Sequence, residues 1–285
     1  MITVPARFAA RFTDPAARRW IDELPGLAER LCATWSLRPD GPVLHGFVAI
    51  ALPVRRADGS PAMLKLTARD PETVDEPLAL ATWDGNGAVR LLAHDDAHGA
   101  LLLERLDSNR ILDDEPIDVA VPVAGELLRR LSVPAPRLSR RLSEMAERWC
   151  VELPAENIDG IVPQPLLDKA IGLCRELGPR AAGLMVNEDL HYQNILRGRR
   201  EPWLAIDPKV LTGDPEFALI SLLWNRFDAD DTIERLATLT EIAGLDLGLA
   251  RKWTFVRAID NWLWAAHGGE FPSVDICARI AQLVG

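Results

Sequence analysis

The sequence predicts an α+β protein of two lobes, a small lobe built on an antiparallel sheet and a larger helical lobe. Strand-like segments rich in apolar and β-branched residues are concentrated before residue 107, and helical periodicity dominates after it. A length of 285 residues suits two unequal lobes. We therefore expect residues 1–106 to form the first lobe and residues 107–285 to form the second.

The first lobe should begin with an amphipathic helix. Asp14 supplies an N-cap, and Pro15 occupies the first helical position, where its missing N–H is tolerated. Apolar side chains then recur at helical spacing: Trp20, Leu24, Leu27, Leu31 and Trp35.

Strands follow this helix. Two segments rich in β-branched and apolar residues, separated by turn residues at 57–60, predict a hairpin. A short helix is expected over 72–83 despite Pro77, and it ends at the glycine-rich turn before residue 88. The predicted strands are 43–54, 62–67, 88–95 and 99–106.

The second lobe should be helical, with short strand-like segments that bracket its densest polar cluster. The predicted helices cover about 117–131, 138–150 and 164–178, and helical patterns resume from Glu216 to the C-terminus. The strand-like segments are 183–186, 194–196 and 203–206.

Composition excludes several classes of protein. Apolar residues make up 48% of the chain and charged residues 26%, as in folded globular domains. The N-terminus lacks the apolar core of a secretion signal, and no run approaches the roughly 18 apolar residues of a membrane span. A net charge of −10 disfavours nucleic acid and favours cationic ligands. We expect a cytoplasmic protein with neither nucleic-acid nor membrane partners.

The cysteines indicate neither a metal site nor a disulfide framework. They are scattered along the chain, with no CxxC pair and no histidine at metal-ligand spacing. We expect Cys32, Cys150, Cys174 and Cys277 to be free, buried thiols.

The polar cluster carries the chemistry. Asp189 and Asn194 have the D-x-x-x-x-N spacing of a kinase catalytic loop, and Asp207 ends an apolar strand further on. Phosphoryl transfer needs a carboxylate to accept the proton of the attacking hydroxyl, and oxygen ligands for the Mg²⁺ that bridges the phosphates. We predict that Asp189 is catalytic and that Asn194 and Asp207 bind Mg²⁺. The alternative is ordinary turn chemistry, in which Asp and Asn are common.

These and other segments together resemble the aminoglycoside phosphotransferase family, in its streptomycin 6-kinase and hydroxyurea phosphotransferase branch. The resemblance runs from about Trp35 to the tryptophan-rich C-terminus. It is carried by VLHGFVAIALPV, DGSPAMLKL, EPLALATWDGNGAVRLL, LLLERL, VNEDLHYQNILRG and LAIDPKVLTGDP. It implies a protein-kinase-like two-lobed fold, the use of ATP and Mg²⁺, and a hydroxyl acceptor on a small molecule.

The resemblance also implies residues that bind the nucleotide. Lys65 resembles the lysine that holds the α- and β-phosphates, and Glu76 resembles its ion-pair partner on the next helix. Glu104, Arg105 and Leu106 resemble the hinge, whose backbone would bind adenine. The alternatives without a functional role are that Lys65 is a solvated lysine on a strand and that Glu76 is a carboxylate favoured by the dipole at the start of a helix.

The sequence departs from the family pattern at several positions. Asn187 stands where histidine is usual, and the segment with Gly41 and Gly46 lacks the G-x-G-x-x-G of a phosphate-covering loop. Ala218 stands where an aspartate is expected to support the catalytic loop, so we expect Asp214 to take over that role.

The acceptor site should lie in the helical lobe. Direct in-line transfer needs no covalent step, so we do not assign His191 as a nucleophile. The C-terminal tryptophans, for which core packing is the alternative, could line a pocket for a cation together with nearby carboxylates. The candidate carboxylates are Glu216, Asp228, Asp230, Asp231, Asp260 and Glu270.

The sequence thus predicts an ATP-dependent O-phosphotransferase of a small hydroxylated molecule, which the resemblance makes an aminoglycoside such as streptomycin, with antibiotic resistance as the outcome. Two alternatives stay open. One is a housekeeping sugar or amino-alcohol kinase on the same fold. The other is a catalytically weak nucleotide-binding pseudokinase, suggested by Asn187 and Ala218. The acceptor, the hydroxyl that is phosphorylated and the oligomeric state are not encoded in any recognisable pattern.

Overall fold

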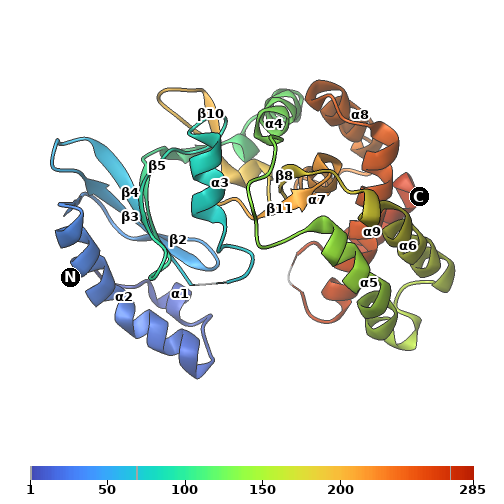
Figure 1. Ribbon diagram of the computed structural model, residues 1–285, viewed down its shortest axis with the longest axis horizontal. Helices are drawn as coiled ribbons and strands as arrows, with labels where there is room; N and C mark the ends of the chain where they lie inside the picture. Colours follow the sequence, from blue (N-terminus) through green and yellow to red (C-terminus); the bar gives the residue numbers. More distant parts are fainter. Residues whose placement is uncertain (1, 69, 270) are drawn as a thin grey trace. The chain divides into compact units, whose positions relative to one another are not determined.

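The computed structural model describes residues 2–68, 70–269 and 271–285 (Figure 1). The described residues form two compact units. One contains the chain up to residue 85 together with residues 89–106, and the other contains residues 86–88 and 107–285.

An antiparallel sheet organises the first unit. Its strand order is β1-β3-β4-β6-β5, with β2 paired to β3. Lys65 lies in the central strand β4, opposite Ala51 on one side and Leu101 on the other. The strands are β1 (Arg38–Pro39), β2 (Leu44–His45), β3 (Ala49–Arg55), β4 (Pro61–Thr67), β5 (Leu91–Asp95) and β6 (Ala100–Glu104).

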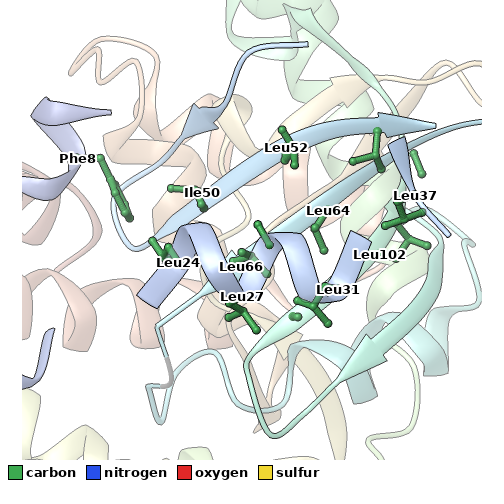
Figure 2. Packing of buried hydrophobic residues seen from close by; sticks show 14 of the residues in the cluster. Phe8, Leu24, Leu27, Leu31, Leu37, Ile50, Leu52, Leu64, Leu66 and Leu102 are labelled. Carbon is green, nitrogen blue, oxygen red and sulfur yellow. The ribbon is translucent and has the colours of Figure 1, made fainter. Parts of the chain in front are cut away.

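The predicted N-terminal helix covers one face of this sheet. After the short α1 (Ala6–Ala9), α2 (Pro15–Thr34) begins at Asp14, whose Oδ1 accepts the N–H groups of Ala16 and Ala17. The apolar stripe Leu24, Leu27 and Leu31 is buried against leucines and Ile50 of the sheet (Figure 2). Burying each leucine contributes roughly 2 kcal/mol. This helix and its capping agree with the sequence prediction.

Two predicted elements differ from the structure. The single strand expected over 43–54 is a hairpin, in which the Gly46 N–H bonds the Ala49 carbonyl at 3.0 Å between β2 and β3. The helix expected from residue 72 begins later, as α3 (Glu76–Trp83). Pro77 therefore falls in the first turn, where its missing N–H breaks no intrahelical hydrogen bond.

Short strands frame the polar cluster of the second unit. β7 (Asp107–Ile111), β9 (Ile195–Arg197) and β10 (Trp203–Ala205) form an antiparallel sheet. β8 (Leu184–Asn187) pairs with β11 (Val210–Gly213), with Asn187 opposite Val210. The sequence pattern did not predict β7, whose residues are polar and mostly exposed, or the four-residue β11.

The rest of the second unit is helical. Its longest helix, α9, starts at the N-cap Asp246 and buries Trp253, Phe255 and Ile259 completely or nearly so. The helices are α4 (Ile117–Leu131), α5 (Leu142–Glu156), α6 (Gln164–Leu177), α7 (Ile220–Trp224), α8 (Thr232–Ala243), α9 (Leu247–Ala266) and α10 (Val274–Val284). Sheets in one unit and helices around short strands in the other confirm the predicted α+β class.

Two expectations about the whole chain can also be compared with the structure. All four cysteines are free thiols; Cys174 and Cys277 are buried, and Cys32 and Cys150 are only partly so. No helix among the described residues is both long enough and apolar enough to cross a membrane.

Candidate active site

The second unit brings the three predicted polar residues together. Asp189 follows β8, and Asn194 ends a short 3₁₀ turn (Tyr192–Asn194) just before β9. The Asn194 side-chain Nδ2 donates to the Asp189 carbonyl at 3.1 Å and approaches Asp189 Oδ2 at 3.5 Å. The Asn194 carbonyl accepts the N–H of Ile206 at 2.8 Å, which sets Asp207 beside the same loop.

The backbone at Asp207 adopts an unusual conformation. Its φ of 49° lies in the left-handed region, which Asp tolerates better than most side chains. Residues held in such sparsely populated conformations are often found at functional sites. The turn after β10 thus holds Asp207 in a defined, sparsely populated backbone conformation.

Asp189 is partly buried, with 34% of its side chain exposed, and lies beside several charged groups. Burial raises the pKa of its carboxyl group, while the nearby charges of His191, Lys209 and Arg257 act in the opposite direction. The His191 Nε2 lies 3.8 Å from Asp189 Oδ1, and burial lowers the pKa of that imidazole. A carboxylate whose pKa is raised by burial is suited to accept a proton from a hydroxyl group.

Asn187 replaces the usual histidine without loosening the loop. Its side chain is buried, and its Oδ1 accepts the backbone N–H of Asp189 at 3.2 Å and that of Lys209 at 3.3 Å. The Glu188 N–H also bonds the Lys209 carbonyl at 2.9 Å. One amide oxygen therefore ties Asp189 to the segment that follows Asp207.

Three further side chains fasten the loop, and the sequence analysis missed all of them. The Ser221 hydroxyl donates to the Glu188 carbonyl at 2.6 Å, and Arg257 Nη1 reaches the same carbonyl at 3.3 Å. The Asn225 Oδ1 accepts the Tyr192 N–H at 3.2 Å. Ser221 and Asn225 interrupt an apolar run, and this interruption is the signal that could have revealed them.

The expectation that Asp214 supports the catalytic loop in place of Ala218 was wrong. Its Oδ1 accepts the Ala182 N–H at 2.7 Å and its Oδ2 accepts the Trp253 indole N–H at 2.7 Å, so it links β11 to α9 and to the segment before β8. Ala218 is buried. Ser221, one helical turn later, supplies the polar contact that Ala218 cannot.

The first unit contains the predicted lysine and glutamate as an ion pair. Lys65 Nζ lies 2.7 Å from both Oε1 and Oε2 of Glu76, and the two side chains are only 7% and 3% exposed. The solvated-lysine alternative does not describe this pair. Charges removed from water in this way are retained only with a close partner.

The predicted hinge residues contact their own unit. Glu104 Oε1 accepts the Arg90 N–H at 2.8 Å, and Arg105 Nη2 donates to Asp40 Oδ2 at 2.7 Å. Residues 104–106 are half-buried. Because the Glu104 and Arg105 side chains bond Arg90 and Asp40, we expect the hinge to contact adenine through its backbone groups.

Comparison with known proteins identifies the family. A family model described as aminoglycoside/hydroxyurea antibiotic resistance kinase matches residues 34–269, well over half of the chain. The chain belongs to this family.

Relatives of this kinase span its whole length. Hydroxyurea phosphotransferase of Kitasatospora aureofaciens is 41% identical over 293 residues, which cover 100% of this chain and 86% of the relative. Streptomycin 6-kinase of Streptomyces glaucescens is 39% identical over 297 residues, covering 99% and 97%. The predicted family and branch are thereby confirmed.

A solved structure confirms the protein-kinase-like fold. Choline kinase LicA from Streptococcus pneumoniae superposes with a TM-score of 0.62 over 92% of this kinase and 99% of that chain, at 13% identity. LicA has also been solved with AMP, at a TM-score of 0.61. This likeness shows the fold, and membership of the resistance-kinase family makes the chain a phosphotransferase.

The carboxylates proposed for an acceptor pocket occupy different places in the kinase. Glu216 is buried and accepts the Asp246 N–H, while Asp228, Asp230 and Asp231 lie at the start of α8. Asp260 lies on α9, and Glu270 falls outside the described residues. Of the tryptophans, Trp253 is core and Trp264 is 48% exposed.

Proposed function

We propose that this kinase transfers the γ-phosphoryl group of ATP to a hydroxyl group of a small molecule, and that Asp189 accepts the proton of that hydroxyl. One observation carries the proposal: a partly buried Asp189 is fastened beside Asn194 and Asp207 by partly buried hydrogen bonds, in a chain of the resistance-kinase family. We further propose that Lys65, oriented by Glu76, binds the phosphates, and that the hinge 104–106 binds adenine through its backbone.

The residues fit a Mg²⁺ ion. Because Asn194 donates through Nδ2 to Asp189, its Oδ1 is the atom that could coordinate a cation, and Asp207 adds a carboxylate. Mg²⁺ prefers such hard oxygen donors and keeps several waters, so a small protein ligand set is sufficient. When bound, Mg²⁺ would neutralise charge on the phosphates. The remaining work, which is orienting the acceptor and taking its proton, belongs to Asp189.

The acceptor we favour is an aminoglycoside such as streptomycin, because two relatives about 40% identical are streptomycin 6-kinases. A hydroxyurea-phosphorylating enzyme is the second candidate, on the strength of the relative at 41% identity. Use of ATP supports the expected cytoplasmic location. A sugar or amino-alcohol kinase is the remaining alternative.

The test is ATP consumption by the wild type and by Asp189→Asn against streptomycin, other aminoglycosides, hydroxyurea, amino sugars and neutral sugars. The amide keeps the shape of the carboxylate but cannot take up the proton, so kcat should fall by about 10²- to 10⁴-fold, or roughly 3 to 5 kcal/mol of barrier. ATP affinity should change little. Asp275→Asn, which changes an exposed carboxylate on α10, serves as the matched control.

Activity of Asp189→Asn within a few-fold of wild type would remove Asp189 from the chemistry. A wild type that is inactive on the whole panel but binds ATP would favour the pseudokinase alternative.

A further inference from the structure

A groove lies where α5 and α9 end in the second unit. It has a volume of about 320 Å³ and is lined by Ala155, Glu156, Ile158, Trp264 and His267. The His267 Nε2 donates to the Glu156 carbonyl at 2.9 Å, which joins the two helix ends. The groove is therefore built by the packing of two long helices.

Trp264 presents a fixed aromatic surface in this groove. Gly269 packs directly on the indole, where a Cβ atom would overlap the ring, and its N–H bonds the Trp264 carbonyl at 3.1 Å. The side chain nevertheless stays 48% exposed. An indole that is held in place and half open to solvent is suited to contact a ligand.

One face of α9 leads from the catalytic loop to the groove. Arg257, Asp260, Trp264 and His267 follow the three- and four-residue spacing of a single helix face. Arg257 bonds the carbonyl of Glu188, the residue before Asp189. From Arg257 to Trp264 the helix rises about 10 Å, at about 1.5 Å per residue.

A second helix leads from the loop to the same place. On α5, Met145, Trp149 and Glu156 are separated by four and seven residues and share a face. Arg140, just before α5, contacts the Met145 sulfur at 3.8 Å and forms a partly buried ion pair with Glu188. Two separate elements thus connect the neighbour of Asp189 to the groove.

Negative charge lies along this path. Asp260 accepts a hydrogen bond from the Trp149 side chain and is near the carboxylates of Glu156 and Glu188. Burial raises the pKa of Asp260 to about 7, and the positive charge of Arg257 partly opposes this shift. A cation placed at the groove would be attracted by Glu156 and by ionised Asp260.

We propose that this groove binds a positively charged nitrogen group of the acceptor, a guanidinium or an ammonium, while a hydroxyl elsewhere on the same molecule reaches Asp189. Cations prefer the face of tryptophan to other aromatic rings, and Glu156 supplies the counter-charge. The volume is at the lower end of the roughly 300 to 1,000 Å³ of small-molecule pockets, which suits one group of a larger acceptor. The proposal rests on the proposed function and specifies its acceptor.

The test compares a cationic acceptor with a neutral one. Streptomycin, which carries guanidinium groups, and uncharged hydroxyurea are each titrated calorimetrically and assayed for KM with the wild type, Trp264→Ala, Trp264→Phe and Glu156→Gln. Trp264→Ala and Glu156→Gln should each weaken streptomycin binding at least tenfold, and Trp264→Phe should restore most of it. The KM for hydroxyurea should stay within twofold of wild type.

Glu147→Gln is the matched control. It removes an exposed carboxylate from the same helix, but one that lines a different groove, between α5 and α6. Streptomycin binding should be unchanged in this variant. If Glu147→Gln lost as much streptomycin affinity as Glu156→Gln, the attraction would come from the overall negative charge of the protein and not from the groove, and the proposal would be overturned.

Other outcomes separate the groove from the proposed function. Three outcomes would each overturn the groove assignment. In the first, Trp264→Ala and Glu156→Gln both bind streptomycin as tightly as the wild type does, and in the second, they raise the KM for hydroxyurea as much as that for streptomycin. The third outcome is a wild type that does not bind streptomycin at millimolar concentration. Streptomycin binding that needs Trp264 and Glu156, in a protein that phosphorylates none of the panel, would support the groove and refute the proposed function.

Discussion

At the scale of single residues, burial decides how much the Lys65–Glu76 pair matters. Lys252 and Glu176 make a contact of the same length, 2.7 Å, but those side chains are 43% and 45% exposed, against 7% and 3% for Lys65 and Glu76. Exposed pairs contribute little to stability, whereas a buried charge left without its partner is costly.

Lys65→Met should therefore both weaken ATP binding, by tenfold or more, and destabilise the protein by about 3 kcal/mol. Calorimetric titration with ATP and chemical denaturation measure the two effects. The double variant Lys65→Met/Glu76→Gln should regain part of the stability but none of the ATP affinity.

Lys252→Met is the control and should change neither quantity. If ATP affinity survives Lys65→Met, Lys65 belongs to the fold and not to the nucleotide site.

Asn187 can be tested in the same way, because its Oδ1 serves the backbone of both Asp189 and Lys209. Asn187→Ala leaves these two N–H groups without that acceptor, at a cost of about 1 to 3 kcal/mol for each group that stays buried. We expect kcat to fall while ATP affinity stays near wild type. Assays of both quantities, with the exposed Asn109→Ala as control, check this prediction.

An unchanged kcat in Asn187→Ala would mean that Ser221, Asn225 and Arg257 alone are sufficient to hold the loop.

The residues of the site were predictable to different degrees for a physical reason. Asp189 and Asn194 lie five positions apart, so local spacing alone indicated their role. Ser221 and Arg257 lie 33 and 69 positions from the Glu188 carbonyl that they contact, and only the folded structure brings them there. Asp214 was misassigned because its partners, Ala182 and Trp253, lie 32 and 39 positions away in sequence.

At the scale of elements, α9 carries a prediction about pH. Burial raises the pKa of Asp260 from 3.8 to about 7, so between about pH 4 and 7 this carboxyl holds a proton in the folded state but not in the unfolded state. Stability falls with rising pH wherever the folded state binds more protons. Asp260 should therefore make the kinase progressively less stable across this window.

Asp260→Asn should remove that contribution and raise stability at pH 8 relative to wild type, because the amide can still accept the Trp149 hydrogen bond without a charge. Denaturation midpoints measured from pH 5 to 8 test this. Asp275→Asn, at an exposed position on α10, should leave the wild-type slope in place. A parallel pH slope in Asp260→Asn would show that other groups cause the dependence.

Element boundaries show where local sequence is insufficient. The helices α2 and α4 were predicted well because capping and periodicity act within a few residues. The turn between β2 and β3 sits inside an apolar run, and Gly46 was its only signal. The strands β7 and β11 depend on pairing with β9 and β8, so their own residues could not reveal them.

At the scale of the whole molecule, composition indicated the class of ligand without naming it. The chain carries 42 acidic and 32 basic residues, for a net charge of −10. A field of this sign raises the local concentration of cations and speeds their association. Fold alone does not determine the acceptor, which is why the sequence left aminoglycoside and sugar kinases open.

The long-range field predicts how salt affects catalysis. Interactions between exposed charges are screened beyond about 8 Å at physiological ionic strength, so raising the salt concentration should weaken capture of a cationic acceptor. At saturating ATP and Mg²⁺, the KM for streptomycin should rise several-fold between 50 and 500 mM salt, by roughly 1 kcal/mol at most for interactions of this kind. Hydroxyurea has no charge to screen, so its KM should stay flat and serve as the internal control. If the KM for streptomycin were equally independent of salt, the acidic surface would play no part in recognition. If a neutral sugar proved to be the best substrate, the housekeeping alternative would be favoured.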